Sequence, residues 1–211
     1  MDSFIPYYHL FLKKRETIVV FDFDGTITRK DTLFEFIKFS KGNRQFYFGF
    51  MLFLPLTIAM KLKIFPNWKI KQSLFSYFYK DVSIEDFNNW CKKFSFEIDK
   101  IVRPKAIETL KFHENNDDKI VIISASIENW IKFWAEKAGV DTVLATKIET
   151  DEKSVITGSF STKNCYGQEK VNRLLSEFPN RDKYQLIAYG DSRGDKELID
   201  FADKGYYNKF I

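Results

Sequence analysis

The 211-residue chain has few of the residues that build disulfide frameworks or nitrogen- and sulfur-ligated metal centres. It has two cysteines, Cys91 and Cys165, with no CxxC pair, and two histidines, His9 and His113. These scarcities argue against a disulfide framework, a cysteine zinc site and a histidine-rich metal site, and they favour a reducing compartment. The first residues also lack a basic segment followed by an apolar run and a small-residue cleavage site. We therefore expect no signal peptide and a cytoplasmic location.

Aromatic side chains, by contrast, are abundant and unevenly placed. The chain has 23 Phe, 10 Tyr and 4 Trp, and 18 of these 37 lie within residues 32–102. The same segment carries 11 Lys/Arg against 6 Asp/Glu, whereas the rest of the chain carries 22 against 23. Two compositions in a chain of this length predict one domain with an inserted unit. The basic residues of the segment interleave with apolar residues at helical spacing, so we expect no nucleic-acid partner.

The parts of the chain outside this segment alternate between strand-like and helix-like patterns. Three runs rich in β-branched and aromatic residues are typical of buried strands in a parallel sheet, at 17–23, 118–124 and 184–189. Residues 127–138 have apolar residues at helical spacing, with Ser126 as the expected N-cap and Gly139 as the C-terminal stop. A further strand is expected at 143–146 and part of a hairpin at 154–160.

This alternation predicts an α/β fold with a doubly wound, Rossmann-like parallel sheet. We expect residues 1–31 and 103–211 to form this core and residues 32–102 to form an inserted all-helical cap domain. Within the cap, helices are predicted at 31–40, at 67–80, and from Ser83 to about residue 102.

One cap segment, 45–60, contains no charged residue. As a helix it would cover about 24 Å, which is short of the ~30 Å hydrocarbon core of a bilayer, and Pro55 is expected to kink it. Two interpretations are open. The segment is either a buried helix of a small bundle, or it dips into one leaflet with Lys61 and Lys63 at the headgroups. The second interpretation gives peripheral membrane contact through 45–65, at the inner face of the membrane.

The first motif with chemical potential is Asp22-Phe23-Asp24-Gly25-Thr26, directly after the first predicted strand. Two carboxylates leaving a strand together offer the oxygen ligands that Mg²⁺ prefers. An aspartate beside such an ion can attack phosphorus, and a second one can move the proton. Gly25 allows a phosphate to approach the backbone, which makes Gly25 and Thr26 candidates for phosphate contact.

Three more motifs follow the other predicted strands. Ser124-Ala125-Ser126 offers a hydroxyl and backbone amides at an expected helix start, which is typical of an anion site. Lys170, in the run GQEKV, can neutralise a phosphate. Asp191 and Asp195, in the run GDSRGD, can complete an oxygen-ligated metal site. The carboxyl ends of parallel strands share one edge of a sheet, so we expect all four motifs to converge there.

The chain thus contains, in this order, DxDGT, a strand ending in Ser, a downstream Lys and GDSxxD. This set of motifs resembles the haloacid dehalogenase superfamily of Mg²⁺-dependent phosphotransferases. The resemblance spans about residues 22–195. It implies that Asp22 is the nucleophile and that Asp24 is the general acid/base, which also lends its backbone carbonyl to the metal. An aspartate at position 24 is typical of the phosphatases and phosphotransferases of the superfamily, and is missing from its dehalogenases.

The resemblance also implies the roles of the remaining motif residues. Ser124 would bind phosphate, with Ala125 and Ser126 beside it, and Lys170 would neutralise the phosphate. The implied Mg²⁺ site consists of Asp22, Asp24, Asp191 and Asp195.

The helical insertion resembles the cap of the phosphoserine-phosphatase-like subfamily, in which an acid at the position of Asp31 often contacts substrate. Asp31 is equally well explained as a helix N-cap. Residues 45–102 contain no arginine, whereas serine-phosphate enzymes use a cap arginine for the substrate carboxylate. The apolar segment, Ser-Ala-Ser and NCYGQEKV resemble the branch that includes phosphatidylglycerophosphatase C, which acts on a lipid phosphate.

The sequence therefore predicts a Mg²⁺-dependent phosphomonoesterase that forms an aspartyl-phosphate. Its expected substrate is a small phosphorylated metabolite, and the alternative is a phospholipid head group at the membrane surface. A non-catalytic phosphate-binding module is the interpretation from another functional class.

Overall fold

The computed structural model describes residues 15–61 and 67–211, so Lys63 and the side chain of Lys61 lie outside the described part. Its centre is a five-stranded sheet in the order β3-β2-β1-β6-β7, in which every neighbouring pair is parallel. The strands are β1 (Glu16–Phe21), β2 (Lys119–Ile127), β3 (Thr142–Thr146), β6 (Tyr184–Gly190) and β7 (Lys204–Tyr207). From β1 the chain winds to one side for β2 and β3 and to the other for β6 and β7. The predicted doubly wound α/β core is confirmed.

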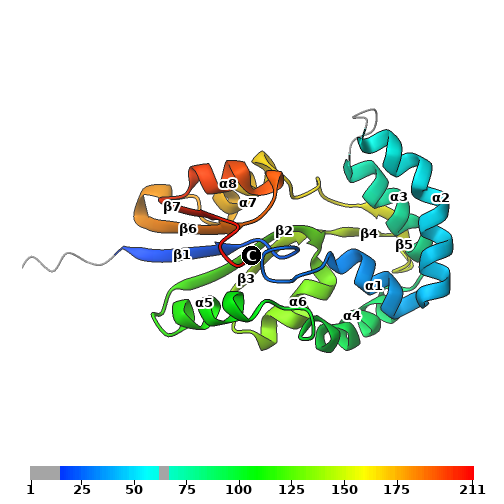
Figure 1. Cartoon of the computed structure of the whole chain (residues 1–211), viewed down its shortest axis with the longest axis horizontal. Helices are drawn as coiled ribbons and strands as arrows, with labels where there is room; N and C mark the ends of the chain where they lie inside the picture. Colours follow the sequence, from blue (N-terminus) through cyan, green and yellow to red (C-terminus); the bar gives the residue numbers. More distant parts are fainter. Residues whose placement is uncertain (1–14, 62–66) are drawn as a thin grey trace, which may run out of the picture.

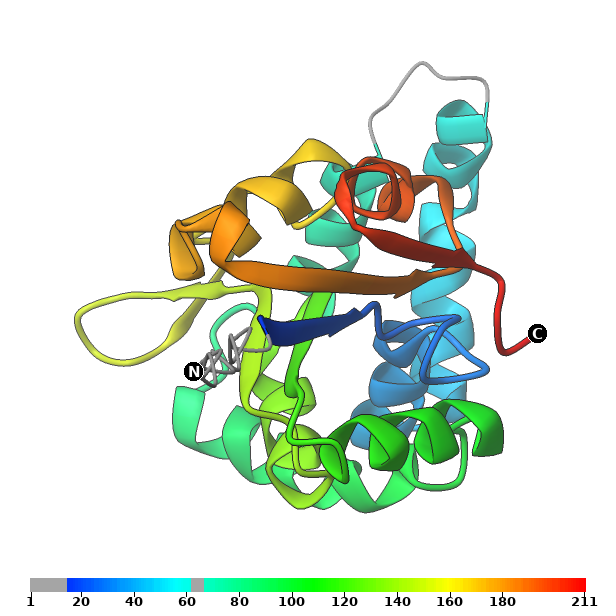
Figure 2. The same ribbon diagram turned by 90° about the vertical axis from the view of Figure 1, so that its left-hand side faces the viewer.

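Helices cover both faces of this sheet (Figures 1 and 2). They are α5 (Pro104–Glu114), α6 (Glu128–Lys137), α7 (Gln168–Glu177) and α8 (Lys196–Phe201), with short 3-10 helices η1 (Arg181–Lys183) and η2 (Arg193–Asp195). Successive residues of β1 point to opposite faces, as strand geometry requires. Ile18 and Val20 pack with Val171 of α7, whereas Val19 and Phe21 belong to the larger cluster on the α5–α6 side. The sheet is therefore buried on both faces.

The insertion lies beyond the carboxyl ends of the strands (Figure 1). It consists of α1 (Thr32–Lys41), α2 (Asn43–Lys61), α3 (Asn67–Tyr79) and α4 (Ile84–Ile98). Asp31 caps α1 by accepting a hydrogen bond from Leu33 N at 2.9 Å, and Ser83 caps α4 by accepting one from Asp86 N at 3.1 Å. The last helix ends at Ile98, a few residues before the predicted end. Aromatic rings form the centre of the bundle, and Phe36 stacks on Trp130 of the core at 4.8 Å.

The predicted hairpin is present as β4 (Ile148–Thr150) and β5 (Ile156–Phe160), which pair antiparallel. It lies against the insertion, where Phe160 packs on Phe75 of α3 at 5.5 Å. Backbone hydrogen bonds join the two parts, from Asp81 N to Ile156 O and from Ile156 N to Val82 O, both 2.9 Å long. The insertion is thus attached to the core at a place far from its own two ends.

The prediction that Ser126 caps the helix after β2 is wrong. Strand β2 continues to Ile127, which occupies the N-cap position of α6 without a side-chain hydrogen bond. The hydroxyl of Ser126 lies 3.0 Å from the hydroxyl of Thr32 instead. A hydroxyl already used in this contact with the insertion is not available to the helix start.

Of the two interpretations of 45–60, the buried helix is wrong for the side chains that the structure describes. Phe46 is buried and Phe50 and Phe53 are half-buried, but Phe48 is 62% exposed and Met51 is 71% exposed. The reason is that α2 lies at the edge of the insertion, where the bundle covers one side of it (Figure 1). The helix continues through Pro55 to Lys61. None of the helices in the described ranges is long and apolar enough to cross a membrane.

Candidate active site

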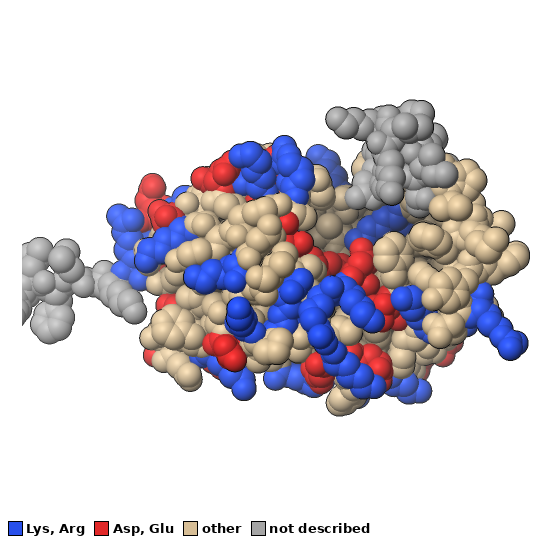
Figure 3. Space-filling view, viewed as in Figure 1, with Lys and Arg blue, Asp and Glu red and all other residues tan. Residues whose placement is uncertain are grey.

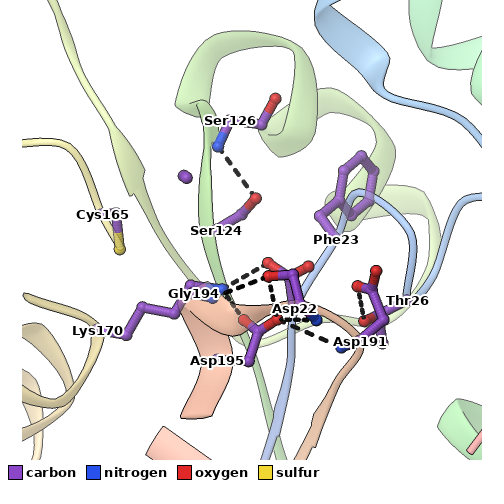
Figure 4. Close-up of polar contacts among 12 residues, drawn as sticks. Asp22, Phe23, Thr26, Ser124, Ser126, Cys165, Lys170, Asp191, Gly194 and Asp195 are labelled. Carbon is purple, nitrogen blue, oxygen red and sulfur yellow. Dashed lines mark hydrogen bonds and ion pairs between the residues drawn. The ribbon is translucent and has the colours of Figure 1, made fainter. Parts of the chain in front are cut away.

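The four predicted motifs meet at the carboxyl edge of the sheet. Asp22 directly follows β1, Ser124 lies near the end of β2, and Asp191 directly follows β6. These strands are neighbours, so their carboxyl ends bring the three side chains to one place. Lys170 reaches the same place from the first turn of α7 (Figure 4).

Lys170 lies between two carboxylates. Its Nζ is 2.6 Å from Asp22 Oδ1 and also donates to Asp195 Oδ1, and the lysine side chain is only 2% exposed. Burial by itself would lower the pKa of Lys170, but Asp22 and Asp195 outweigh burial and raise it. Burial would raise the pKa of Asp195, and Lys170 outweighs it and holds the pKa low. Lys170 is therefore a permanent positive charge at this place.

Three carboxylates converge around this lysine. Asp22, Asp191 and Asp195 each offer an oxygen within 4.8 Å of the other two. Asp191 accepts a hydrogen bond from Thr26 Oγ1 at 2.8 Å. Asp195 Oδ2 accepts from Ser192 N and Ser192 Oγ at 2.9 and 2.8 Å. Three of the predicted metal ligands, Asp22 after β1 and Asp191 and Asp195 after β6, are thus held close together.

This cluster fits a divalent cation. Burial raises the pKa of Asp22 to about 8; Lys170 opposes that rise and Asp195 adds to it. With all three carboxylates ionised, one lysine leaves the cluster with an excess of two negative charges. A set of only oxygen donors with that charge suits Mg²⁺, which would be held here by Asp22, Asp191 and Asp195.

The side chain of Asp24 takes a different direction. Its Oδ1 accepts hydrogen bonds from Thr32 N at 2.9 Å and Thr32 Oγ1 at 2.6 Å. Burial raises the pKa of Asp24 to about 6, Asp31 adds to the rise, and Lys71 opposes it. A carboxyl group with a pKa near neutrality can give and take a proton at cellular pH.

Gly25 and Thr26 lie against Asp191 and do not line the cavity described below. Gly25 has φ +88°, and a Cβ placed on it would stand 2.3 Å from Asp191 Oδ2. Only glycine combines this backbone conformation with that close approach. Their predicted role in phosphate contact stays a prediction, whereas their contact with a proposed metal ligand is observed.

Ser124 and Ala125 line the cavity, and Ser126 is buried beside them. Ser124 Oγ accepts a hydrogen bond from Ser126 N at 3.1 Å, which holds the turn of the backbone. The carbonyl of Ala125 accepts from Lys71 Nζ at 2.6 Å and from Thr146 Oγ1 at 2.9 Å. Ser124 is therefore the residue of this motif with a hydroxyl that faces the site.

A cavity of about 410 Å³ opens from the carboxylates toward the insertion. Asp22, Asp24, Ser124 and Lys170 line one part of it. Asp31 also lines it, so this residue both caps α1 and faces the site. The volume lies in the range of small-molecule sites.

Thr32 and Lys71 are among the site residues that sequence reasoning missed. Thr32 connects Asp24 to Ser126, and its hydroxyl also accepts a hydrogen bond from Trp130 Nε1 at 3.1 Å. Lys71 lines the cavity from α3. Thr32 directly follows an expected N-cap, and Lys71 is one of two lysines in the first turns of α3, so neither stands out in the sequence.

The fold is that of a known class of enzyme. Residues 19–200 match the family of haloacid dehalogenase-like hydrolases, and the chain belongs to that family. It is 32% identical to Protein CicA of Caulobacter vibrioides over 193 residues, which cover 90% of this chain and 85% of that protein.

Solved structures show the same fold. A protein of unknown function from Bordetella pertussis Tohama I is similar with a TM-score of 0.78 and 14% identity, over 92% of this chain and 89% of that one. A phospho-aspartyl intermediate analogue of phosphoserine phosphatase is similar with a TM-score of 0.64 and 19% identity, over 92% and 86%. The predicted superfamily and fold are confirmed.

Proposed function

We propose that this hydrolase is a Mg²⁺-dependent phosphomonoesterase that acts through an aspartyl-phosphate on Asp22. The observation that carries the proposal is the carboxylate cluster at the cavity: Lys170 donates to Asp22 and Asp195, Asp191 lies close to both of these carboxylates, and Asp22 and Lys170 line the cavity. When bound, Mg²⁺ would supply positive charge that stabilises the transferring phosphoryl group.

The residues of the chain supply the remaining steps. The Asp22 carboxylate attacks phosphorus in line with the ester oxygen, which leaves as Asp24 gives it a proton. Asp24 then takes a proton from water, and that water cleaves the acyl phosphate to release inorganic phosphate and free Asp22. Lys170 and Ser124 hold the phosphoryl oxygens, whose negative charge Lys170 compensates.

The test compares wild-type protein with Asp22→Asn and Asp24→Asn. Both variants should retain the fold and lose phosphate release by several orders of magnitude. Wild-type protein quenched in acid during turnover should carry a phosphate on the peptide that contains Asp22. Asp24→Asn should still form this phosphoenzyme from an ester with a good leaving group, because such a group needs no proton.

Unchanged phosphate release by Asp22→Asn would overturn the mechanism. Release at trace level by wild-type protein, with every ester of a broad panel, would favour the non-catalytic phosphate-binding module.

The first candidate substrate is a small phosphorylated metabolite. The similarity of the fold to a phosphoserine phosphatase supports it, and the cavity volume of about 410 Å³ suits a small molecule.

A lipid phosphate at the membrane surface is the second candidate, and the outer side of α2 favours it. Tyr47, Phe48, Met51 and Leu52 are all exposed there. Figure 3 shows a largely uncharged surface on the side of the molecule where α2 lies. Exposed apolar patches of this kind are typical of interaction sites. A neighbouring groove is lined by Lys41, Arg44 and Phe48, and its cations suit an anionic lipid surface.

Vesicle flotation of the full chain tests the second candidate. Wild-type protein should float with vesicles that contain anionic phospholipid, and Phe48→Ser should float several-fold less. Phe112→Ser is the matched control, because Phe112 is also 62% exposed but lies on α5. Equal flotation of the two variants would count against contact through α2.

A further inference from the structure

The part of the cavity farther from the carboxylates is apolar. Phe50 and Phe53 of α2 and Trp68, Ile70 and Leu74 of α3 line it. Phe50 and Phe53 lie three residues apart on α2, on the side opposite the exposed Phe48 and Met51. The rings are fixed by their neighbours, since Phe50 packs on Phe34 at 6.2 Å and Phe53 packs on Tyr77 at 5.7 Å.

Few polar groups of α2 and α3 face this part of the cavity. Among the lining residues of these helices, Lys71 is the one with a charge, and its Nζ already donates to Ala125 O at 2.6 Å. A leaving group with a carboxylate would therefore meet aromatic rings and one cation that is already hydrogen-bonded. Burying a charged group without partners is costly, whereas burying an apolar group against these rings is favourable.

We propose that the enzyme acts on phosphate monoesters with an apolar leaving group, which Phe50, Phe53 and Trp68 bind while the phosphate lies at Asp22 and Lys170. This substrate class rests on the proposed phosphatase activity. It differs from phosphoserine in that the bound group is recognised by burial of hydrocarbon and needs no charged partner.

The test compares esters of similar chemical reactivity. Hexyl phosphate and ethyl phosphate both release a primary alcohol, and they differ by four methylene groups. Each buried methylene raises binding roughly fourfold. Wild-type kcat/KM should therefore be at least tenfold higher for hexyl phosphate than for ethyl phosphate, and also higher than for O-phosphoserine.

Variants of the wall should remove this preference selectively. Phe50→Ala and Trp68→Ala should lower kcat/KM for hexyl phosphate by about tenfold and leave ethyl phosphate nearly unchanged. Phe112→Ala is the control, because Phe112 is an exposed phenylalanine on α5 that does not line the cavity, and this variant should keep the preference. Thermal unfolding of each variant confirms that the fold is intact.

The outcomes separate the two proposals. If O-phosphoserine is hydrolysed better than hexyl phosphate, the apolar substrate class is wrong and the phosphatase stands. If no ester is hydrolysed, the phosphatase proposal fails. Calorimetric measurement of the binding of hexylphosphonate and ethylphosphonate to the Mg²⁺-loaded protein then tests whether the cavity prefers an apolar group. Equal affinities for the two phosphonates would overturn the proposal that the apolar side of the cavity binds the leaving group. An affinity at least tenfold higher for hexylphosphonate would support it.

A further arm identifies the source of the apolar group. Phosphatidic acid is supplied in detergent micelles and in vesicles, beside hexyl phosphate in solution. A higher kcat/KM for the vesicle substrate identifies a bilayer lipid, and a higher kcat/KM for hexyl phosphate identifies a free small molecule. Both results support an apolar leaving group.

Discussion

At the scale of single residues, Gly25 allows Asp191, a proposed metal ligand, to come close to the backbone. Its φ of +88° and the 2.3 Å that would separate a Cβ at this position from Asp191 Oδ2 are two separate requirements for glycine. Gly42 has nearly the same φ, +85°, but a Cβ there would meet nothing within 4 Å. Alanine substitutions at these two glycines therefore separate the effect of backbone strain from the effect of displacing Asp191.

Gly25→Ala should lose most of the activity and weaken Mg²⁺ binding by at least tenfold, because Asp191 must move to make room for the methyl group. Gly42→Ala should lose a similar amount of thermal stability from backbone strain and keep Mg²⁺ binding. Titration of Mg²⁺ by calorimetry measures the difference. Equal Mg²⁺ affinities in the two variants would contradict the close approach as the reason for glycine at position 25.

Asn164 is a second residue at which stability and function should separate. It lines the cavity, and its Oδ1 is the one buried side-chain oxygen in the described ranges with no hydrogen-bond partner. A buried polar atom without a partner costs stability, and its position on the cavity wall leaves it available to a bound ligand.

Asn164→Leu should leave the melting temperature unchanged or raise it, because the unpaired oxygen is replaced by hydrocarbon of similar volume. The same change should lower kcat/KM by about tenfold, because a ligand then loses that partner. Thermal unfolding and steady-state kinetics on the same preparation measure the change in melting temperature and the change in kcat/KM. A melting temperature that falls sharply while kcat/KM is unchanged would show that Asn164 is purely structural.

At the scale of secondary-structure elements, the edge of the sheet near β7 depends on one aspartate. Asp203 Oδ2 accepts a hydrogen bond from the backbone N of Leu186 in β6 at 2.7 Å and from Arg181 Nη2 at 2.9 Å. The backbone hydrogen bond from Leu186 is the main reason why the pKa of Asp203 is lowered, and Arg181 contributes as well.

The lowered pKa sets the pH range in which ionised Asp203 contributes to the free energy of unfolding. It is fully present above the pKa of an unfolded-chain aspartate, about 4, and it is lost as the pH falls through the lower folded-state pKa. Asp203→Asn should therefore be less stable than wild type at pH 7, and the difference should shrink by pH 3. Urea midpoints at both pH values measure it, with exposed Asp200→Asn as control. A difference that is the same at both pH values would contradict the assignment.

The elements differ in how far the sequence predicts them. The strands and the residues after them are predictable, since Asp22 and Asp191 each follow a short run of β-branched or aromatic residues, and one edge collects the carboxyl ends of parallel strands. The contacts of Thr32 and Lys71 are not predictable, because they arise when the insertion folds back over that edge. The sequence leaves the exposed side of α2 undecided for a similar reason, since an uncharged run looks the same whether the bundle covers one side of the helix or both.

At the scale of the whole molecule, the proposed Mg²⁺ site should make stability depend on magnesium. The cluster of Asp22, Asp191 and Asp195 exists only in the folded chain, so Mg²⁺ should raise the melting temperature in a concentration-dependent way. At 100 times the dissociation constant the gain is about 2.7 kcal/mol.

Asp191→Asn should be close to wild type in stability without Mg²⁺ and should gain much less when Mg²⁺ is added. Thermal unfolding in EDTA and in Mg²⁺ compares the two proteins. Equal shifts in both proteins would mean that the ion binds somewhere other than the predicted cluster.

The hairpin of β4 and β5 restricts how the cavity can open. An insertion joined to the core only at residues 31 and 103 could swing as a lid about those two points. Here, backbone hydrogen bonds also join it to β5, at Asp81 and Val82. A swing must either break these bonds or carry the hairpin along, with bending where the hairpin leaves the core, near Lys147 and Ser161. Any displacement of the insertion would therefore pull on β5 as well, and the chain runs on from β5 to α7, the helix that carries Lys170.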